Sequence, residues 1–309
     1  MATVRTVFDN TTNKDLLKGT LRKLHDDTVR EAKVEYKIVC NDLKAKDIYE
    51  RDARMAGLQY PSEIVEGQGI PIQTPAMGTT KTYTQRYFAT GFRMTFAMDF
   101  FNKFNLWKRW TKDLAKVMKE GKDYEIATMF NNMTSTGLTC GTGFDSLAIA
   151  NDTHTGLNPN TTGDNYDNYL NAALSQSGLE SMRYYFATLR DDMGYWMGAK
   201  PTHLVIEPTL FFTAKELLGS DNRAHEFSNT INVLPELNLK LFEYHRLTST
   251  TCWFAIAKDS KYDFNVFTAL EPKMFIKDAS DDTLDKVALS IQFFTYGWGN
   301  PKQLYCGDT

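Results

Sequence analysis

The histidines are the first residues to examine for chemistry, because histidine is a common metal ligand and general base. His25 is followed directly by Asp26 and Asp27, and adjacent positions on a helix point in different directions. The HExxH motif of zinc proteases is absent from the sequence. The other histidines stand apart, at His154, His203, His225 and His245. We therefore predict no metal site, and we interpret the cluster at His25 as a solvated helix end.

Paired carboxylates are the second chemical signal. Asp191 and Asp192 fall at the predicted end of a helix, where solvated charge explains them. Asp281 and Asp282 fall in a predicted turn, and the same explanation holds. The G-x-S-x-G motif of serine hydrolases and the G-x-x-x-x-G-K-[ST] phosphate loop are absent. We predict no catalytic residue and no cofactor. A hydrolase with an unrecognised active site, using carboxylates such as Asp191 or Glu207, remains an alternative.

Composition limits the possible function classes. The chain has 309 residues, of which 42% are hydrophobic and 13% aromatic, so it can bury a sizeable core. Its net charge of −3 argues against a strongly basic nucleic-acid binder. The four cysteines contain no CxxC pair, which favours a reduced folding compartment. No stretch approaches 18 apolar residues and the N-terminus lacks an apolar signal core, so we expect neither a membrane span nor secretion.

One long amphipathic helix is the element around which the chain is predicted to be organised. From Leu106 to Met133, about 28 residues follow helical spacing, which makes a rod of roughly 42 Å. We assign this helix to residues 104–133. Its large apolar residues are Trp107, Trp110, Leu114, Val117, Met118, Tyr124, Ala127 and Phe130. We expect the other layers of the protein to pack on it.

The segments before this helix are predicted to be extended or only partly buried. Residues 1–12 are polar and predict an extended arm, and residues 14–30 predict a short amphipathic helix. Alternation over residues 34–40 predicts a half-buried strand. Residues 54–92 carry glycines and prolines and then a β-rich stretch, which predicts an extended β-hairpin. Such a hairpin is marginal alone in water, so we expect it to lie on a neighbouring molecule.

The segments after the helix predict a mixture of helices and strands. Between residues 175 and 258 we expect a helix with a capping box at Ser177 and Glu180, running to about Asp192. We then expect a strand at residues 203–206, a helix ending at Gly219, and strands at residues 238–245 and 252–257. The tail, residues 259–309, returns to long alternating strands. The fold class is therefore α+β, with a domain inserted into a discontinuous one.

The order of these segments resembles the major capsid protein of tailed bacteriophages, a fold shared with encapsulins and the herpesvirus capsid floor. EGQGIPIQTPAMGTTKTYTQRYFATGFRMTFAMD resembles the extended hairpin of that family. FDSLAIANDTHTG resembles a loop of the family in a degraded form. THLVIEPTLFFTAKELLGSDNRAHEFSNTINVL resembles the inserted domain. The resemblance covers nearly the whole chain.

This resemblance implies an organisation into named parts. Residues 1–32 would form the N-terminal arm and short helix, and residues 54–92 the extended β-hairpin loop. Residues 175–258 would form the axial α+β domain. The peripheral sheet domain, with the long helix as its spine, would combine the remaining segments, 33–53, 93–174 and 259–309.

The resemblance also implies a function. The protein would be the subunit of an icosahedral shell, assembled as pentamers and hexamers in the host cytoplasm and found in the virion capsid. The shell would enclose double-stranded DNA without sequence specificity. Its other partners would be a separate scaffolding protein, a portal and decoration proteins. An encapsulin-like compartment is the nearer alternative, because the sequence does not distinguish it from a virus shell.

The expected contact residues follow from this resemblance. Contacts between subunits are expected at Glu66, Gly67, Pro71, Lys81, Tyr83, Arg86, Tyr87, Arg223 and Glu226. A basic stripe that faces DNA or a neighbouring subunit is expected at Lys108, Lys112, Lys116 and Lys119. Some members of the family crosslink a hairpin lysine to a partner asparagine. The hairpin here carries Lys81, but no partner residue aligns, so no crosslink is predicted.

Overall fold

The computed structural model describes residues 10–55, 57–74, 77–101, 104–155, 165–220, 231–278 and 285–308. Its helices are α1 (Asn10–Glu31), α2 (Phe96–Phe100), α3 (Phe104–Asn131), α4 (Gln176–Thr188) and α5 (Phe211–Gly219). Its strands are β1 (Asn41–Lys44), β2 (Tyr49–Met55), β3 (Met77–Thr84), β4 (Arg86–Met94), β5 (Tyr169–Leu170), β6 (Pro201–Ile206), β7 (Lys240–Glu243), β8 (Trp253–Ala257), β9 (Phe264–Asp278), β10 (Lys286–Trp298) and β11 (Leu304–Gly307). No described helix is long and apolar enough to cross a membrane.

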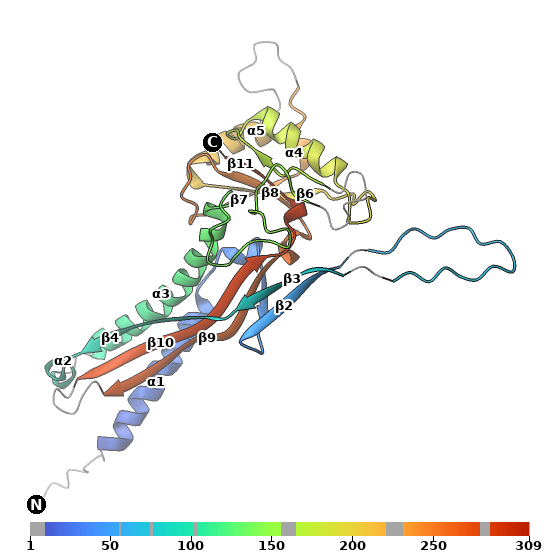
Figure 1. Ribbon diagram of the computed structural model, residues 1–309. Coiled ribbons are helices and arrows are strands. Elements are labelled where there is room, and N and C mark those ends of the chain that lie inside the picture. The colour runs from blue at the N-terminus through green and yellow to red at the C-terminus, as the bar shows by residue number, and fades with distance from the viewer. Residues whose placement is uncertain are drawn as a thin grey trace, which may run out of the picture.

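The described strands form three sheets. A four-stranded sheet has the order β1-β9-β10-β4, and α1 and α3 pack against each other and against it. A five-stranded sheet has the order β5-β11-β8-β6-β7 and lies at the other end of α3, beside α4 and α5 (Figure 1). β2 and β3 pair with each other in a separate two-stranded ribbon. The loop that connects these two strands projects away from the rest of the molecule (Figure 1).

The predicted spine helix is present as α3. Its buried positions recur at helical spacing and include Trp107, Leu114, Met118 and Phe130, each at most 6% exposed. Val117 was expected in this apolar set but is 54% exposed, because it lies on the outer side of the helix.

Three charged residues of α3, Lys119, Lys122 and Asp123, are buried, which the sequence did not indicate. The ammonium group of Lys122 donates a 2.7 Å hydrogen bond to the Thr268 hydroxyl and lies 3.6 Å from Asp42. The carboxylate of Asp123 accepts hydrogen bonds from the backbone N–H groups of Glu35 and Tyr36. Buried charges are tolerated when partners of this kind satisfy them. Here they attach the segment after α1 to the spine.

The C-terminal half of α3 joins the two large sheets. The ring of Phe130 stacks on Phe254 of the five-stranded sheet, with ring centroids 5.2 Å apart. It also contacts Phe264 of the four-stranded sheet at 5.4 Å. The same core cluster includes Val205 and Trp298, one from each sheet. The two sheets therefore share one hydrophobic core.

The N-terminal region differs from the sequence prediction. Helix α1 begins at Asn10, so residues 10–12 are helical, although they were predicted as extended. Residues 34–40 do not form the expected strand. They contain a short 3-10 helix (Tyr36–Ile38), and the strand starts at Asn41. The hydrogen bonds to Asp123 hold the chain in this turn and override its alternating pattern.

His25 was predicted to be solvated, and this was wrong. His25 belongs to α1, and its ring is completely buried between this helix and the four-stranded sheet. Its Nε2 lies 3.0 Å from the Ser290 hydroxyl of β10. Burial lowers the pKa of His25, although the neighbouring Asp26 acts in the opposite direction. The ring is therefore a core residue that attaches α1 to the four-stranded sheet.

The boundaries of the other elements also need correction. Helix α4 is capped by Ser175, whose hydroxyl accepts from the Gly178 N–H, and not by the predicted box at Ser177. It ends at Thr188, before Asp192. The five-stranded sheet includes β5 and β11, which lie outside residues 175–258, because the chain returns to this sheet at its C-terminus.

Strand β4 does not belong to the hairpin. It pairs with β10 along its whole length in the four-stranded sheet, from Arg86 opposite Phe294 to Met94 opposite Lys286. The predicted hairpin range of 54–92 is therefore too long. Alternation alone does not say which strand a β-segment joins.

We expect Phe130→Ala to lower the free energy of unfolding by about 3–5 kcal/mol, because it leaves a cavity where the two sheets meet. Urea denaturation of the purified protein measures this change. Val117→Ala, at an exposed position on the same helix, is the matched control and should cost less than about 1 kcal/mol. Equal losses in the two variants would contradict a central role for Phe130.

Candidate subunit interface

The arm, defined here as residues 57–74 between β2 and β3, is the most exposed apolar segment that the structure describes. All of its residues are exposed except Gln73, which is half-buried. Ile70 is 80% exposed and Ile72 is 94% exposed. The other large apolar residues of the arm are Leu58, Tyr60, Ile64 and Val65, each at least 42% exposed. Exposed apolar side chains concentrated in one segment in this way are typical of an interaction site.

One pair of hydrogen bonds, between Gln59 and Gln73, connects the two branches of the arm. The Gln59 N–H donates to the Gln73 side-chain oxygen at 2.6 Å, and the Gln73 side-chain nitrogen donates back to the Gln59 carbonyl at 3.2 Å. At the tip, Gly67 has φ of +89°, a conformation that favours glycine, and the Gln68 N–H closes the turn on Val65. The arm is thus a hydrogen-bonded loop, although the strands end before it.

A buried charge cluster anchors the root of the arm. The guanidinium of Arg54 donates two hydrogen bonds to the Asp192 carboxylate, at 2.7 and 3.2 Å. The ammonium of Lys302 donates to the same carboxylate at 2.6 Å. The side chains of Arg54, Asp192 and Lys302 are at most 12% exposed. The register of the β2–β3 ribbon shifts between Ala53 and Met55, which places Arg54 at an irregularity.

Electrostatics favour the charged form of this cluster. Burial by itself would raise the pKa of Asp192, but the hydrogen bond from Arg54 and the charge of Lys302 lower it below its ordinary value. A lowered carboxyl pKa stabilises the fold at neutral pH, and this contribution disappears as the pH falls through the folded-state value. The solvated interpretation of Asp192 was therefore wrong.

The arm also contacts the loop that follows α4. The rings of Tyr60 and Tyr195 stack with centroids 3.7 Å apart, and the Tyr60 N–H donates to the Tyr195 hydroxyl at 3.1 Å. On β3, which follows the arm, the Thr79 hydroxyl donates to the Phe144 carbonyl at 2.7 Å. These contacts fix where the arm leaves the molecule.

Two of the expected contact residues lie inside their own subunit. Lys81 is 8% exposed, and its ammonium donates to the Trp298 carbonyl at 2.9 Å. Tyr83 is 2% exposed and packs against Phe267. Burial lowers the pKa of Lys81 to about 8, while Cys140 and Asp52 act in the opposite direction. These two residues attach β3, the strand that follows the arm, to the body of the subunit.

The remaining expected contacts have different positions. Glu66, Gly67 and Pro71 lie on the exposed arm. Tyr87 is 58% exposed on β4, and Arg86 forms a 3.3 Å ion pair with Glu125 of α3. Arg223 and Glu226 lie outside the described residues.

The four lysines of the expected basic stripe on α3 differ in their exposure to solvent. Lys108, Lys112 and Lys116 are exposed. Lys119 is 8% exposed and forms a 2.6 Å ion pair with Glu271 of β9. An outward-facing stripe therefore contains the first three lysines and excludes Lys119.

His154 is a further residue whose role the sequence did not indicate. Its Nδ1 lies 2.6 Å from the Asp145 carboxylate, and its Nε2 lies 3.1 Å from the Ile149 carbonyl. The ring is completely buried and stacks on Tyr166, with centroids 4.6 Å apart. Both ring nitrogens are already engaged and solvent does not reach them, so this pair orders the loop between α3 and β5.

The carboxylates considered for hydrolysis bind the backbone. Asp191 accepts hydrogen bonds from the N–H groups of Met193 and Tyr195. Glu207 accepts from the Thr209 N–H and hydroxyl at the start of a short 3-10 helix (Pro208–Leu210). Within the described residues, no group of histidine, cysteine and acidic side chains is arranged to hold a metal ion.

Comparison with known proteins identifies the family. The family described as "Phage capsid protein" matches residues 78–307, which is more than half of the chain. This chain belongs to the phage capsid protein family. A search of curated proteins finds no match for this capsid protein.

Solved structures show that the capsid protein has the tailed-phage capsid fold. It is similar to the capsid of cyanophage P-SCSP1u, with a TM-score of 0.58 and 9% identity over 90% of this chain and 88% of the other. It is similar to the mature capsid of bacteriophage PhiM1, with a TM-score of 0.55 and 11% identity over 89% and 87%. It is also similar to a virus-like particle from Pyrococcus furiosus, with a TM-score of 0.54 and 7% identity over 94% and 98%. The predicted fold class is confirmed.

We expect Asp192→Ala in the capsid protein to lower the free energy of unfolding by about 3–5 kcal/mol, because two buried cations would lose their common partner. Denaturation at neutral pH measures the loss. The matched control is Asp152→Ala, which removes an exposed carboxylate and should change stability by less than about 0.5 kcal/mol. A loss no larger than that of the control would show that the cluster does not hold the root.

We expect Lys81 to give the capsid protein a pH-dependent stability. Because its folded pKa is about 8 and its ordinary value is 10.5, the unfolded chain binds more protons between these values. Stability at this site therefore rises with pH across that window. Lys81→Met should remove this rise in denaturation curves measured from pH 7.5 to 10.5, whereas Lys46→Met, at an exposed position, should retain it. Identical pH profiles for Lys81→Met and the wild type would rule out the effect.

Proposed function

We propose that this capsid protein assembles with copies of itself, as pentamers and hexamers, into an icosahedral shell that encloses double-stranded DNA. The observation that carries the proposal is the arm, whose five large aliphatic side chains are each at least 42% exposed on their own subunit. Burying an aliphatic side chain of this size contributes about 1.5–3 kcal/mol, so one arm seated on a neighbour can offset much of the cost of association.

The anchored root supports this proposal. The arm leaves the subunit at a position held by Arg54, Asp192 and the Tyr60–Tyr195 stack, so less freedom is lost when it binds. We propose that the inter-subunit contacts include Glu66, Gly67 and Pro71 at the arm, together with the exposed Tyr87. A closed shell repeats this one contact many times, so a modest energy per contact is sufficient.

The exposed lysines of α3 support a second part of the proposal. Lys108, Lys112 and Lys116 would face the packaged DNA or an acidic patch of a neighbouring subunit, and contacts to phosphate would carry no sequence information. A separate scaffolding protein, a portal and decoration proteins are the other partners we propose, with assembly in the host cytoplasm.

An encapsulin-like compartment would use the same arm contacts as a virus shell, so the contents of the particle distinguish the two. Nuclease-protected DNA in purified particles supports the virus shell. A protein cargo without DNA supports the compartment.

We expect the double substitution of Ile70→Asp and Ile72→Asp to abolish particle assembly without affecting folding, because both side chains are exposed in the subunit and buried charge is costly at an interface. Electron microscopy and light scattering measure assembly, and circular dichroism measures folding. The matched control, Ile70→Leu with Ile72→Val, keeps the surface apolar and should assemble. Normal particles from the aspartate variant would contradict the role of the arm.

A further inference from the structure

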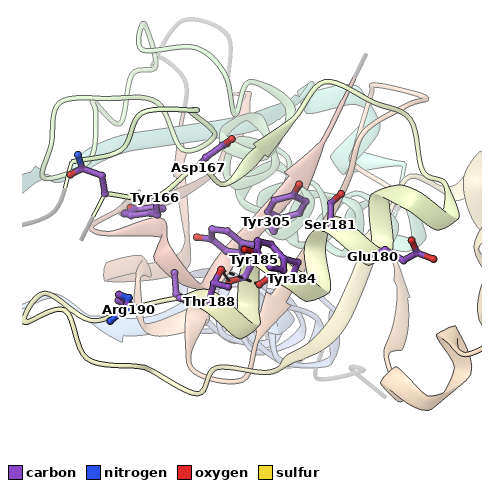
Figure 2. A pocket seen from close by; sticks show the side chains of 11 residues that line it. Tyr166, Asp167, Glu180, Ser181, Tyr184, Tyr185, Thr188, Arg190 and Tyr305 are labelled. Carbon is purple, nitrogen blue, oxygen red and sulfur yellow. Dashed lines mark hydrogen bonds between the residues drawn. The ribbon is translucent and has the colours of Figure 1, made fainter. Parts of the chain in front are cut away.

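A cleft of about 560 Å³ runs along α4, on the side of the five-stranded sheet where β11 lies, and neither the arm nor the root contributes to it. Four tyrosines line it: Tyr166, Tyr184, Tyr185 and Tyr305. Figure 2 shows the rings of Tyr185 and Tyr305 side by side, with Asp167 above them and Glu180 to their right. Its volume lies in the range of about 300–1,000 Å³ that is usual for binding sites.

The tyrosines differ in how their hydroxyl groups are satisfied. Tyr185 donates to the Lys302 carbonyl at 2.6 Å, and Tyr166 donates to the Asn300 side chain at 2.7 Å. Tyr305 is only 5% exposed, yet its hydroxyl makes no hydrogen bond with any described residue. The hydroxyl oxygen is not enclosed by protein atoms and reaches the solvent of the cleft, so it can hydrogen-bond a ligand there. Tyr184, at the rim, is 72% exposed and offers an open aromatic face.

The lining carries two carboxylates that a ligand can reach. Asp167 and Glu180 are both exposed, and each uses one carboxylate oxygen in a described hydrogen bond, to the Tyr169 N–H and the Gln176 side chain. The cation in the lining, Arg190, is already engaged. Its guanidinium donates to the Gly194 carbonyl at 2.7 Å and lies over the Trp196 ring at 4.1 Å.

We propose that this cleft binds a lysine- or arginine-bearing segment of a partner protein. The two carboxylates attract the cations, and the exposed face of Tyr184 receives one of their side chains through a cation–π contact. Tyrosine also supplies a large contact area at low conformational cost, which is why it dominates many peptide-binding surfaces. The free hydroxyl of Tyr305 then pairs with the peptide backbone. Nucleic acid is excluded, because its phosphates would meet Asp167 and Glu180.

Isothermal titration of the full-length protein with hexalysine, and with hexaglutamate in parallel, tests this proposal. We expect hexalysine to bind and hexaglutamate not to bind. Asp167→Asn with Glu180→Gln should weaken hexalysine binding about tenfold, because it removes both negative charges of the cleft. The matched control is Asp259→Asn with Glu63→Gln, which removes two exposed carboxylates elsewhere and should leave binding within about twofold of the wild type.

A second variant tests the aromatic part without changing the charge. Tyr305→Phe removes a single hydroxyl group that bonds to no described residue, so the melting temperature should stay unchanged while hexalysine binding weakens about threefold. Tyr184→Ser, at an exposed position, should also weaken binding. The proposal is overturned if hexalysine does not bind, if both double variants weaken it equally, if both tyrosine variants bind like the wild type, or if hexaglutamate binds as well.

Discussion

The packing of α3 between two sheets is the interaction on which the rest of this capsid protein depends. Phe130 contacts the four-stranded sheet through Phe264 and the five-stranded sheet through Phe254, so neither sheet completes its core without the helix. Two turns earlier, Asp123 binds the backbone after α1, which attaches the N-terminal region to the same helix. The spine is therefore the common surface on which the two large sheets and the N-terminal region pack.

The stability of the subunit and its capacity to associate reside in different parts of the chain. The shared core holds the body together, whereas the arm places its apolar side chains in solvent. The buried charges of Arg54, Asp192 and Lys302 lie at the junction between them. Buried ion pairs contribute little net stability relative to apolar packing, but they demand one geometry. Such a cluster is suited to defining the direction in which an exposed arm leaves a stable body.

Local patterns accounted for much of the fold and little of the site. The helical spacing around Trp107 and Phe130 indicated α3 within two residues of its observed ends. The arm was recognised by its glycines and prolines, but β4 was assigned to it, because alternation does not identify the pairing partner. The charge cluster had no sequence signal, since Arg54 and Asp192 are 138 residues apart. His25 was misjudged because its charged neighbours hid a buried position on α1.

By itself, the sequence determined the elements whose physics is local: the long amphipathic helix, the turn-rich arm and the alternating terminal strands. These depend on side-chain spacing and on the backbone preferences of glycine and proline, which neighbours in the chain set. Only the tertiary structure decided which charges are buried, which strand pairs with which, and where the tyrosine cleft forms. Those features arise when distant segments meet, and the free energy of burial depends on partners that no short window of sequence contains.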